Sequence, residues 1–252
     1  MKVSIITAVF NNVNEIRNAI ESVLSQNYPN IEYIIIDGGS TDGTLDIIKS
    51  YEEKINHLIS ESDQGIYDAL NKGLQKCTGD IIGFLHSDDI FNNQYVISEI
   101  IQTFKINNCD ATYGDLVYVA KVDPSIIIRF WKSSNFELKN FKYGWMPAHP
   151  TLFLKKEVYN NFGHFNIKYQ IAADYDFILR TLASGTLKCI YMPIVVTKMK
   201  TGGASNKSLK NIWKKSFEDW TALKENHAGG IYTLIAKNVS KLNQFIKKSP
   251  QF

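Results

Sequence analysis

Aspartates gather in a few short stretches of the sequence, and the densest is FLHSDDIF at residues 84–91. Asp88 and Asp89 are neighbours in this stretch, and two other acidic stretches contain Asp37 and Asp63. Carboxylates that share one site repel each other unless a cation or a hydrogen-bond donor lies among them. A hard divalent cation held by one or two carboxylates and by substrate phosphates is the usual arrangement. The stretches therefore predict a metal–phosphate site, provided that the fold brings them together.

A simpler use of an aspartate in a loop is to close a turn. Asp37 and Asp42 could each make an Asx turn or cap the helix that follows. For any one of these aspartates alone, the structural and the functional interpretation are equally good. The set of four acids favours the functional interpretation.

A second acidic stretch, ADYDFILRTLASG, begins at Ala173 and has the pattern of a helix. Asp174 and Asp176 are two residues apart and so face different directions, because only residues three or four apart share a helix face. The two acids therefore cannot both be catalytic. Arg180 lies four residues after Asp176, which predicts a surface ion pair. Asp174 lies in the first helical turn, where it is either an N-terminal cap or a functional carboxylate.

The elements around the first four acids alternate between strand and helix. Short apolar runs typical of strands buried on both faces occupy residues 3–9, 31–37, 55–60 and 80–85. The stretches between them have helical periodicity or helix-capping residues. This alternation predicts an α/β fold with right-handed crossovers and a mostly parallel sheet. The carboxyl ends of parallel strands lie at one edge, where such folds bind ligands, so we expect the four acids to share that edge.

The middle of the chain has two more predicted strands and a loop rich in aromatic residues. ATYGDLVYVAK and IIIRFW have the β-branched and aromatic composition of strands. The loop KSSNFELKNFKYGWMP follows, and its aromatic residues alternate with lysines. Trp145 and its neighbours form either a sugar-stacking surface or a small satellite core. His149, in AHPTLF, lies just before the next predicted strand and is either structural or a contact to acceptor or phosphate.

The last part of the chain predicts two amphipathic helices. LKNIWKKSFEDWTALKEN places Ile212, Trp213, Phe217 and Trp220 at helical spacing, and a second apolar pattern follows Gly229 and Gly230. Lysines line the other faces of both helices: residues 210, 214, 215, 237, 241, 247 and 248. Such helices pack on the domain or on a second subunit, or they lie on an anionic membrane. A homodimer and a peripheral membrane contact are both possible partners of this segment.

The composition excludes several classes of protein. With 44% hydrophobic residues the chain can bury a sizeable core, and a net charge of +3 is too small for a nucleic-acid-binding protein. Three distant cysteines predict no disulfide framework or thiolate zinc site. The first residues read as a strand, and no run is long enough to span a bilayer. We expect a cytoplasmic protein, either free or bound peripherally to the inner face of the cytoplasmic membrane.

Six motifs together resemble a known family. They occur in the order TAVFNN, DGGSTDGT, SDQGIYDALNKG, GDIIGFLHSDD, AHPTLF and ADYDFILR. In this order they closely resemble the motifs of inverting family 2 glycosyltransferases with the nucleotide-binding fold called GT-A. The resemblance is nearest to bacterial enzymes that build surface polysaccharides such as O-antigen, capsule or exopolysaccharide. It implies a GT-A domain at 1–205, with a nucleotide-sugar half at 1–105 and an acceptor half at 106–205, followed by a helical extension at 206–252.

The resemblance also implies roles for the acids of the first half. Thr7, Ala8 and Val9 would contact the nucleoside through their backbone, and Asp37 and Asp63 would hold the uracil and ribose of a UDP-sugar. Ser87-Asp88-Asp89 is similar to the DxD-type motif of the family. Asp88 would then face the ribose or donor sugar, and Asp89 would bind Mn²⁺ or Mg²⁺. Many relatives have Asp or Asn where this chain has His86, which we do not expect to bind the metal because both ions prefer oxygen ligands.

In the second half the resemblance implies that Asp174 deprotonates the acceptor hydroxyl. A sugar hydroxyl is a poor nucleophile at neutral pH and needs a positioned carboxylate. The expected acceptor is a saccharide, free or lipid-linked. Further contacts to acceptor or phosphate are expected from Trp145, His149 and Lys200, the last next to the glycine-containing segment TGGAS at 201–205.

Two other classes of protein stay open from the sequence. A sugar-nucleotide nucleotidylyltransferase would carry a Gly-rich basic loop after the first strand, and TAVFNNVNE is not such a loop. A non-catalytic sugar- or nucleotide-binding module would have lost its metal and base residues, whereas both are present here. A dehydrogenase fits less well because DGGSTDG is not GxGxxG and follows the second strand. A glycosidase is disfavoured since a UDP leaving group needs no protonating acid.

Overall fold

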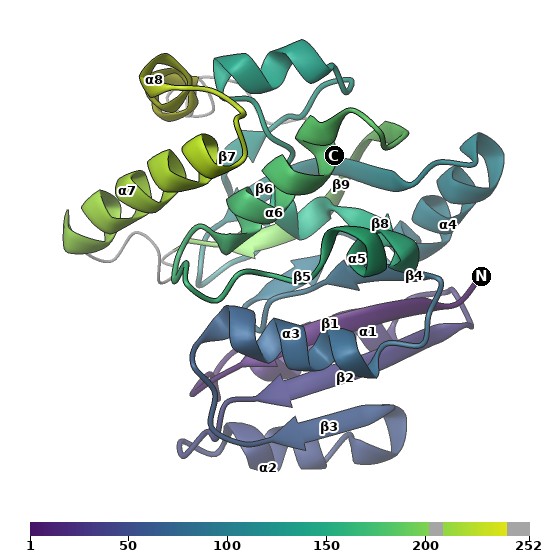
Figure 1. Cartoon of the computed structure of the whole chain (residues 1–252). Coiled ribbons are helices and arrows are strands. Elements are labelled where there is room, and N and C mark those ends of the chain that lie inside the picture. Colours follow the sequence, from purple (N-terminus) through teal and green to yellow (C-terminus); the bar gives the residue numbers. More distant parts are fainter. Residues whose placement is uncertain (202–208, 241–252) are drawn as a thin grey trace.

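The computed structural model describes residues 1–201 and 209–240 (Figure 1). Its centre is a nine-stranded sheet in the order β3-β2-β1-β4-β8-β6-β9-β5, with β7 paired to β6. The strands are β1 (Val3–Val9), β2 (Ile31–Asp37), β3 (His57–Ser60), β4 (Ile81–Phe84), β5 (Asp89–Phe91), β6 (Ala111–Val119), β7 (Ile127–Trp131), β8 (Phe153–Lys155) and β9 (Cys189–Lys200).

Eight α-helices and four short 3₁₀ helices lie around the sheet in the described residues. The α-helices are α1 (Ile16–Leu24), α2 (Thr44–Lys49), α3 (Ile66–Lys76), α4 (Val96–Asn107), α5 (Lys156–Phe162), α6 (Ala173–Thr181), α7 (Leu209–Glu225) and α8 (Ile231–Ser240). The 3₁₀ helices are η1 (Glu52–Lys54), η2 (Leu138–Tyr143), η3 (His149–Thr151) and η4 (Leu182–Ser184).

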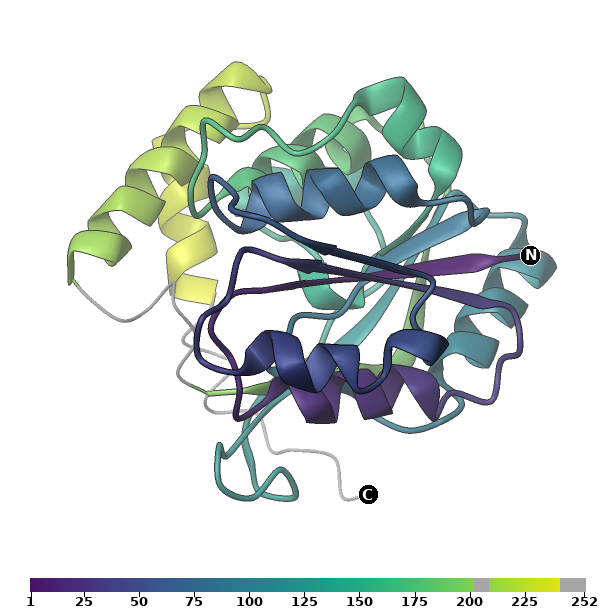
Figure 2. The ribbon, with the colours of Figure 1, turned by 90° about the horizontal axis from the view of Figure 1, so that it is seen from below.

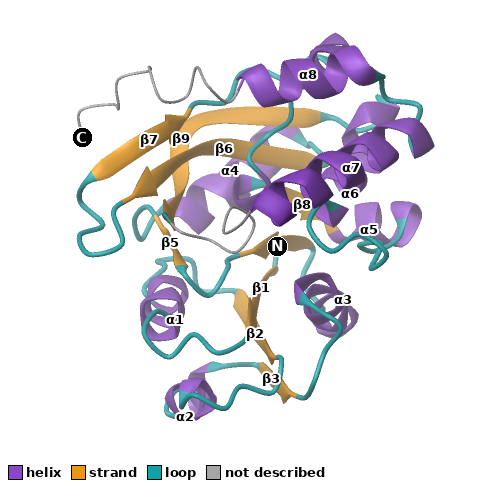
Figure 3. Ribbon diagram, turned by 90° about the vertical axis from the view of Figure 1, so that its left-hand side faces the viewer, coloured by secondary structure: helices purple, strands orange, loops and turns teal. Residues whose placement is uncertain are grey.

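The first four strands are parallel, as the alternating pattern predicts. β1 is buried along its whole length between β2 and β4, which explains its unbroken apolar sequence. α1 and α2 cover one face of these strands, and α3 covers the other (Figures 2 and 3). Val9 is paired with Asp37 at the ends of β1 and β2, so the two loops that follow leave the sheet at the same level. The prediction of an α/β fold is confirmed.

The second half joins the first through an antiparallel strand. β8 runs antiparallel to both β4 and β6, and β6 is parallel to β9. Gly83 on β4 makes this junction possible, because a Cβ there would lie 2.1 Å from the Phe153 ring on β8. β5 pairs antiparallel with β9 and places Asp89 opposite Met199. The sheet is therefore parallel across β3, β2, β1 and β4, and Asp89 lies beyond this part, on the antiparallel strand β5.

The two C-terminal helices differ from the sequence prediction in the face that they bury. α7 lies against α6, and α8 lies against η2 and α7 (Figure 1). The predicted apolar stripe of α7 is not the packed face: Trp213 is 78% and Phe217 is 70% exposed. Glu218 and Asp219 point inward instead, together with Ala222 and Leu223.

Some predictions fall outside the described residues. These are the predicted lysines 241, 247 and 248, the apolar residues beyond Ser240, and all of TGGAS except Thr201. The division of the chain at residue 205 also stays a prediction.

Candidate active site

Asp37 ends β2 at the expected edge, and it holds the turn that follows. Its side chain is fully buried, accepts a hydrogen bond from the backbone N–H of Ser40 and accepts another from Ser60 Oγ at 2.7 Å. The turn returns to β1 through a bond from Gly38 N–H to the Val9 carbonyl. Asp37 therefore ties the loops after β1, β2 and β3 together, as the Asx-turn interpretation predicts.

Asp63 lies beside Asp37 because of a glycine. A Cβ on Gly38 would be 2.5 Å from Asp63 Oδ2, so only glycine at this position allows the carboxylate to rest on the backbone. The other oxygen, Oδ1, accepts the N–H of Gly65 just before α3. Phe10 borders the same spot: its ring is 3.4 Å from the missing Cβ, and the residue is 61% exposed. The structure thus brings Asp37 and Asp63 together, as predicted, next to an exposed aromatic ring.

The loop after β4 is joined to this edge by hydrogen bonds. Thr7 Oγ1 donates to the Leu85 carbonyl, and Asn12 Nδ2 donates to Ser87 Oγ at 2.9 Å. Thr7, Ala8 and Val9 are buried within β1, so any contact that they make to a ligand uses their backbone. Ser87 and Asp88 are half-buried at the same edge.

Asp89 is a buried carboxylate with little hydrogen bonding. Its side chain is fully buried, and neither oxygen has a hydrogen bond of good geometry within the described residues. Burial and the neighbouring charge of Asp88 raise the pKa of Asp89 well above its usual value, and the nearby backbone N–H and charge of Lys200 offset only part of this rise. A buried carboxylate that is only partly compensated, beside a second one, fits a hard cation, which takes one or two carboxylates and completes its shell with phosphate. Residues 1–201 and 209–240 contain no group of three His, Cys, Asp or Glu side chains placed to bind a metal by themselves.

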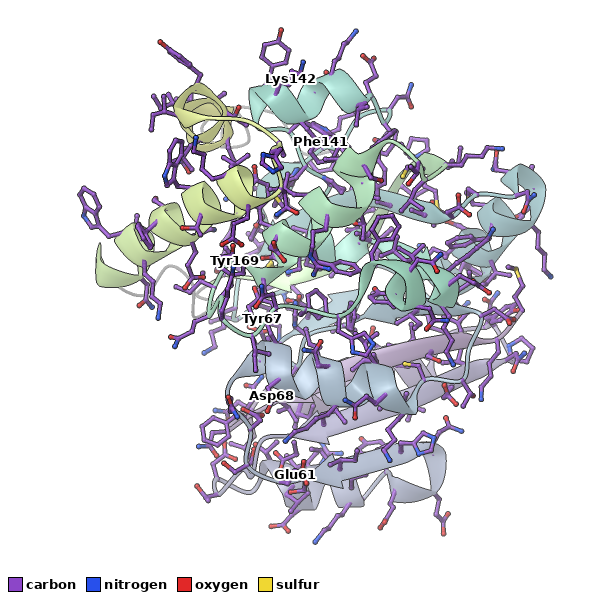
Figure 4. All side chains as sticks on the ribbon, in the orientation of Figure 1. Glu61, Tyr67, Asp68, Phe141, Lys142 and Tyr169 are labelled. Carbon is purple, nitrogen blue, oxygen red and sulfur yellow. The ribbon has the colours of Figure 1, made fainter. Side chains whose placement is uncertain are left out.

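Asp174 lies in a set of hydrogen bonds that connect it to the first half of the chain. Its Oδ2 is 2.9 Å from Nδ1 of His149, and its Oδ1 accepts a bond of 3.1 Å from the hydroxyl of Tyr67 on α3. The Asp174 side chain is 19% exposed. Burial by itself raises the pKa of Asp174, but His149 and the more distant Lys237 and Lys215 outweigh it and hold the pKa below its usual value. Asp174 is thus held ionised at neutral pH, and its partner Tyr67, labelled in Figure 4, lies at the start of α3.

His86 links Asp174 to the Asp88 loop through His149. The Nε2 atoms of His86 and His149 are 3.3 Å apart, so one nitrogen donates a proton to the other. Burial, and then the neighbouring His149, lower the pKa of His86 to about 4, so His86 is neutral at pH 7. Its Nδ1 has no hydrogen-bond partner among the described residues. Asp174, His149 and His86 form a continuous chain from α6 to the end of β4.

The structure places the remaining predicted contacts in packed surroundings. Trp145 makes edge contacts to Tyr113, Phe136 and Phe141 at 5.5–6.1 Å between ring centroids, which supports the satellite-core interpretation. Lys200 is buried and forms an ion pair with Glu15. Contacts from either residue to an acceptor or phosphate stay predictions.

The predicted surface pair of Asp176 and Arg180 is wrong in one respect. Arg180 Nε does donate to Asp176 Oδ2 at 3.0 Å, but Asp176 is buried, since Asn226 after α7 covers it and donates to its other oxygen. The contact between Asn226 and Asp176 could not be predicted from the sequence, because the two residues are fifty positions apart.

Two residues of the site were missed from the sequence. Phe10 extends the apolar run of the first strand, so nothing marked it as exposed. Tyr67 stands in SDQGIYDALNKG on a helix, where a tyrosine is normally part of the core. An alternation of apolar residues cannot reveal which ring projects over a ligand edge.

More than half of the chain, from near its start, matches a family model. Residues 4–160 match the model described as Glycosyl transferase family 2. The chain belongs to this family. The predictions of a family 2 glycosyltransferase and of a glycosyltransferase enzyme are confirmed.

Curated relatives agree with this family. A PGL/p-HBAD biosynthesis glycosyltransferase of Mycobacterium bovis is 27% identical over 208 residues, which is 81% of this chain and 78% of the relative. An uncharacterized glycosyltransferase of Mycobacterium tuberculosis is 30% identical over 198 residues, or 75% of this chain and 72% of the relative.

Solved structures show the same fold. S. aureus TarS 1-349 in complex with UDP-GlcNAc has a TM-score of 0.72 at 17% identity, covering 90% of this chain and 65% of that one. The chain therefore spans slightly less than two thirds of that TarS chain. The mannosyltransferase PcManGT from Pyrobaculum calidifontis, in complex with GDP-Man and Mn²⁺, has a TM-score of 0.66 at 18% identity, covering 97% and 73%. The GT-A prediction is confirmed.

Proposed function

We propose that this protein transfers a sugar from a nucleotide-sugar, a UDP-sugar above all, to a hydroxyl of a saccharide acceptor with inversion at the anomeric carbon. The observation that carries the proposal is the position of Asp174. Its carboxylate is held by Tyr67 of α3 and by His149, which contacts His86 of the β4 loop. An ionised carboxylate is thus attached to the same loops that carry Asp63, Asp88 and Asp89.

The donor is assigned to the edge formed by the loops after β1, β2 and β3. Asp63 rests on the backbone of Gly38, and its carboxylate is placed to accept bonds from a base or ribose. The exposed ring of Phe10 beside it offers a face on which a nucleobase stacks. Asp37 fixes the loops through Ser40 and Ser60. Relatives of the same fold are described with UDP, UDP-GlcNAc and GDP-Man, which supports a nucleotide-sugar at this edge.

A divalent cation, Mn²⁺ or Mg²⁺, is assigned to Asp89, with Asp88 beside it facing the ribose or donor sugar. The fit rests on Asp89, whose buried oxygens have no hydrogen bond of good geometry within the described part of the chain. When bound, such an ion would supply Lewis-acid stabilisation of the charge that gathers on the leaving diphosphate. This chain would contribute the Asp89 carboxylate and the loop that holds it, and substrate phosphate would supply further oxygen ligands.

Asp174 is assigned the role of the base that accepts the proton of the acceptor hydroxyl. Hydrogen bonds from Tyr67 and His149 fix the direction of its carboxylate and leave further lone pairs for a substrate. As the oxygen of the acceptor bonds to the anomeric carbon, the proton passes to Asp174 and the bond to the diphosphate breaks. Attack opposite the leaving group inverts the configuration. A single carboxylate suffices, because the diphosphate leaves without protonation.

Calorimetric titration with UDP-, GDP- and dTDP-sugars, each with Mn²⁺ and with a chelator, tests the donor site. We expect metal-dependent binding of UDP-sugars. Equal affinity with and without Mn²⁺ would overturn the assignment of the cation to Asp89. Lack of binding to every nucleotide would overturn the donor assignment itself.

A further inference from the structure

α7 exposes an aromatic stripe to solvent. Trp213 and Phe217 lie one helical turn apart, are 78% and 70% exposed, and are flanked by the exposed Ile212. A helix on the surface of a domain normally turns such residues toward the core. On α7 the polar residues Glu218 and Asp219 take the inner face instead.

α8 shows the same inversion. Thr233 and Lys237 are buried, and Lys237 Nζ forms an ion pair of 2.7 Å with Asp219 of α7. The exposed side carries apolar residues at a spacing of four, with one tyrosine beside them: Ile231, Tyr232, Ile235 and Val239. We call the exposed residues of both helices the α7–α8 face. It is apolar in the direction away from the domain, which indicates that something covers it.

The acidic side chains of α7 all have partners: Glu218 accepts three backbone N–H bonds from residues 170–172, Asp219 pairs with Lys237, and Glu225 pairs with Lys168. Lys142 on η2 and Lys224 on α7 are exposed basic side chains of the same part of the molecule. Figure 4 shows Lys142 on η2, next to α8, and Thr233 Oγ1 bonds to its carbonyl. Lys224 Nζ also lies 5.3 Å from the centroid of the Trp220 ring.

We propose that the α7–α8 face docks on an anionic lipid membrane. Exposed tryptophan and tyrosine with interspersed lysines are typical of helices that lie in the membrane interface, and each lysine near an anionic surface adds attraction. A second copy of this chain fits less well, because a two-fold contact would place the same lysines against one another. No helix among the described residues is long and apolar enough to cross a bilayer, so the contact is made by helices lying along the surface.

The position of the face relative to the donor edge suits this partner. The carboxyl ends of β1 and β2 and the first residues of α7 lie on the same side of the molecule in two perpendicular views (Figures 1 and 2). The amino end of α7 is therefore on the side of the molecule that carries the donor edge. The inference does not depend on sugar transfer, because membrane binding is measured without donor or acceptor.

Co-sedimentation of the full chain with vesicles tests the proposal. We expect binding to vesicles of phosphatidylglycerol and phosphatidylcholine and little binding to phosphatidylcholine alone. The double variant W213S/F217S should lower the partition onto anionic vesicles by about tenfold or more, since two large apolar side chains no longer enter the lipid. The matched control is I106S on α4, which removes an equally exposed apolar residue and should leave binding unchanged.

A second pair of variants, in which a lysine is replaced by glutamate, tests the electrostatic part of the proposal separately from the apolar part. Lys224→Glu should weaken binding by about fivefold or more, and Lys105→Glu on the exposed side of α4 should not. Both positions are exposed, so neither variant is expected to unfold the chain. Lack of binding of the wild-type protein to anionic vesicles would overturn the proposal. A dimer in light scattering that W213S/F217S converts to monomer would assign the face to a second copy instead.

Discussion

At the scale of single residues, the site separates two carboxylates by their surroundings. Hydrogen-bond donors and positive charges keep Asp174 ionised, whereas burial beside Asp88 raises the pKa of Asp89. Groups whose environments push their pKa values apart have different tasks. An ionised, oriented carboxylate suits a base, and a buried carboxylate with little compensation suits a cation. Asp174 and His149 could both be singled out from the sequence, but their contact with each other and the role of Tyr67 could not, since these residues come from distant segments.

Removing one hydroxyl from Tyr67 tests how Asp174 is oriented. Tyr67→Phe keeps the ring that packs near Phe165 but deletes the hydroxyl, whose single proton is shared between Asp174 and the Ile171 carbonyl. We expect kcat to fall about tenfold, the equivalent of one hydrogen bond of about 1.4 kcal/mol, with unchanged donor affinity. Steady-state kinetics measure both quantities. Tyr232→Phe on the exposed side of α8 is the control, and an unaltered kcat in Tyr67→Phe would show that this bond does not orient the base.

Neutralising Asp89 separates its effect on the stability of the fold from its proposed role in binding the metal ion. Asp89→Asn removes a carboxyl group whose ionised form is disfavoured by burial and by Asp88, so the variant without metal should melt at or above the temperature of the wild type. Addition of Mn²⁺ and UDP should then stabilise only the wild type, by about 2.7 kcal/mol when ligand is a hundredfold above Kd. Thermal melts with and without ligand measure this difference. Equal stabilisation of both proteins would place the cation elsewhere.

At the scale of elements, the two ends of the parallel strands differ in how their polar groups are bonded. The amino ends of β1 and β2 and the turn before β4 are fastened by Glu32, which accepts bonds from Lys2, Ser4 and Thr78. Burial by itself raises the pKa of Glu32, but these bonds outweigh it and lower the pKa to about 2. The carboxyl ends carry the donor loops, whose polar groups are partly open. A rigid amino edge thus supports a ligand-binding edge at the other end.

Glu32→Gln should destabilise the protein in a pH-dependent way. Because the folded pKa is lower than the unfolded value of 4.5, the stabilisation is present above about pH 4.5 and is lost as the pH falls toward about 2. We expect the variant to be less stable by about 2–3 kcal/mol at pH 7. Urea unfolding from neutral pH to pH 3 measures the difference in the free energy of unfolding between the wild type and Glu32→Gln. This difference should become smaller as the pH falls. Glu53→Gln on exposed η1 is the control, and a difference independent of pH would contradict the assignment.

The sequence was sufficient for the main elements of the first half and insufficient for β5 and for some helix faces. Nearly continuous apolar runs placed β1, β2 and β4, and helical periodicity placed α3, because there the apolar residues make the contacts. They failed on α7, where polar contacts decide which face is inside. Glu218 turns inward to bond three backbone N–H groups before α6, and Asp219 turns inward to meet Lys237. Neither partner can be identified from a helical pattern.

At the scale of the whole molecule, the C-terminal helices hold the helix that carries the proposed base. Glu218 of α7 bonds the segment that leads into α6, and Lys237 of α8 lies 3.1 Å from the centroid of the Tyr175 ring, next to Asp174. Burial lowers the pKa of Lys237 to about 8, although Asp219 acts in the opposite direction. Gly144 receives the backbone of Lys237 so closely that a Cβ there would be 2.4 Å from its nitrogen. The extension is thus part of the architecture of the site.

Lys237→Met tests this coupling. The variant leaves Asp219 as an uncompensated buried charge, so we expect a loss of about 3 kcal/mol or more in the free energy of unfolding. Adding Asp219→Asn to the same chain should restore part of the loss, because it removes the stranded charge. Lys105→Met on α4 is the exposed control. Chemical denaturation of the four proteins measures the effect, and a loss below about 1 kcal/mol in Lys237→Met would contradict a structural role for the pair.

The most direct test of the proposed function is Asp174→Asn, with transfer rate and donor affinity measured on the same preparation. The substitution keeps the size of the side chain but deletes its capacity to accept the acceptor proton. We predict that kcat falls by at least about 10²-fold, within the range of general-base contributions, while UDP-sugar affinity with Mn²⁺ is unchanged. Transfer at close to the wild-type rate would contradict the account, because Asp174 would then not be the base.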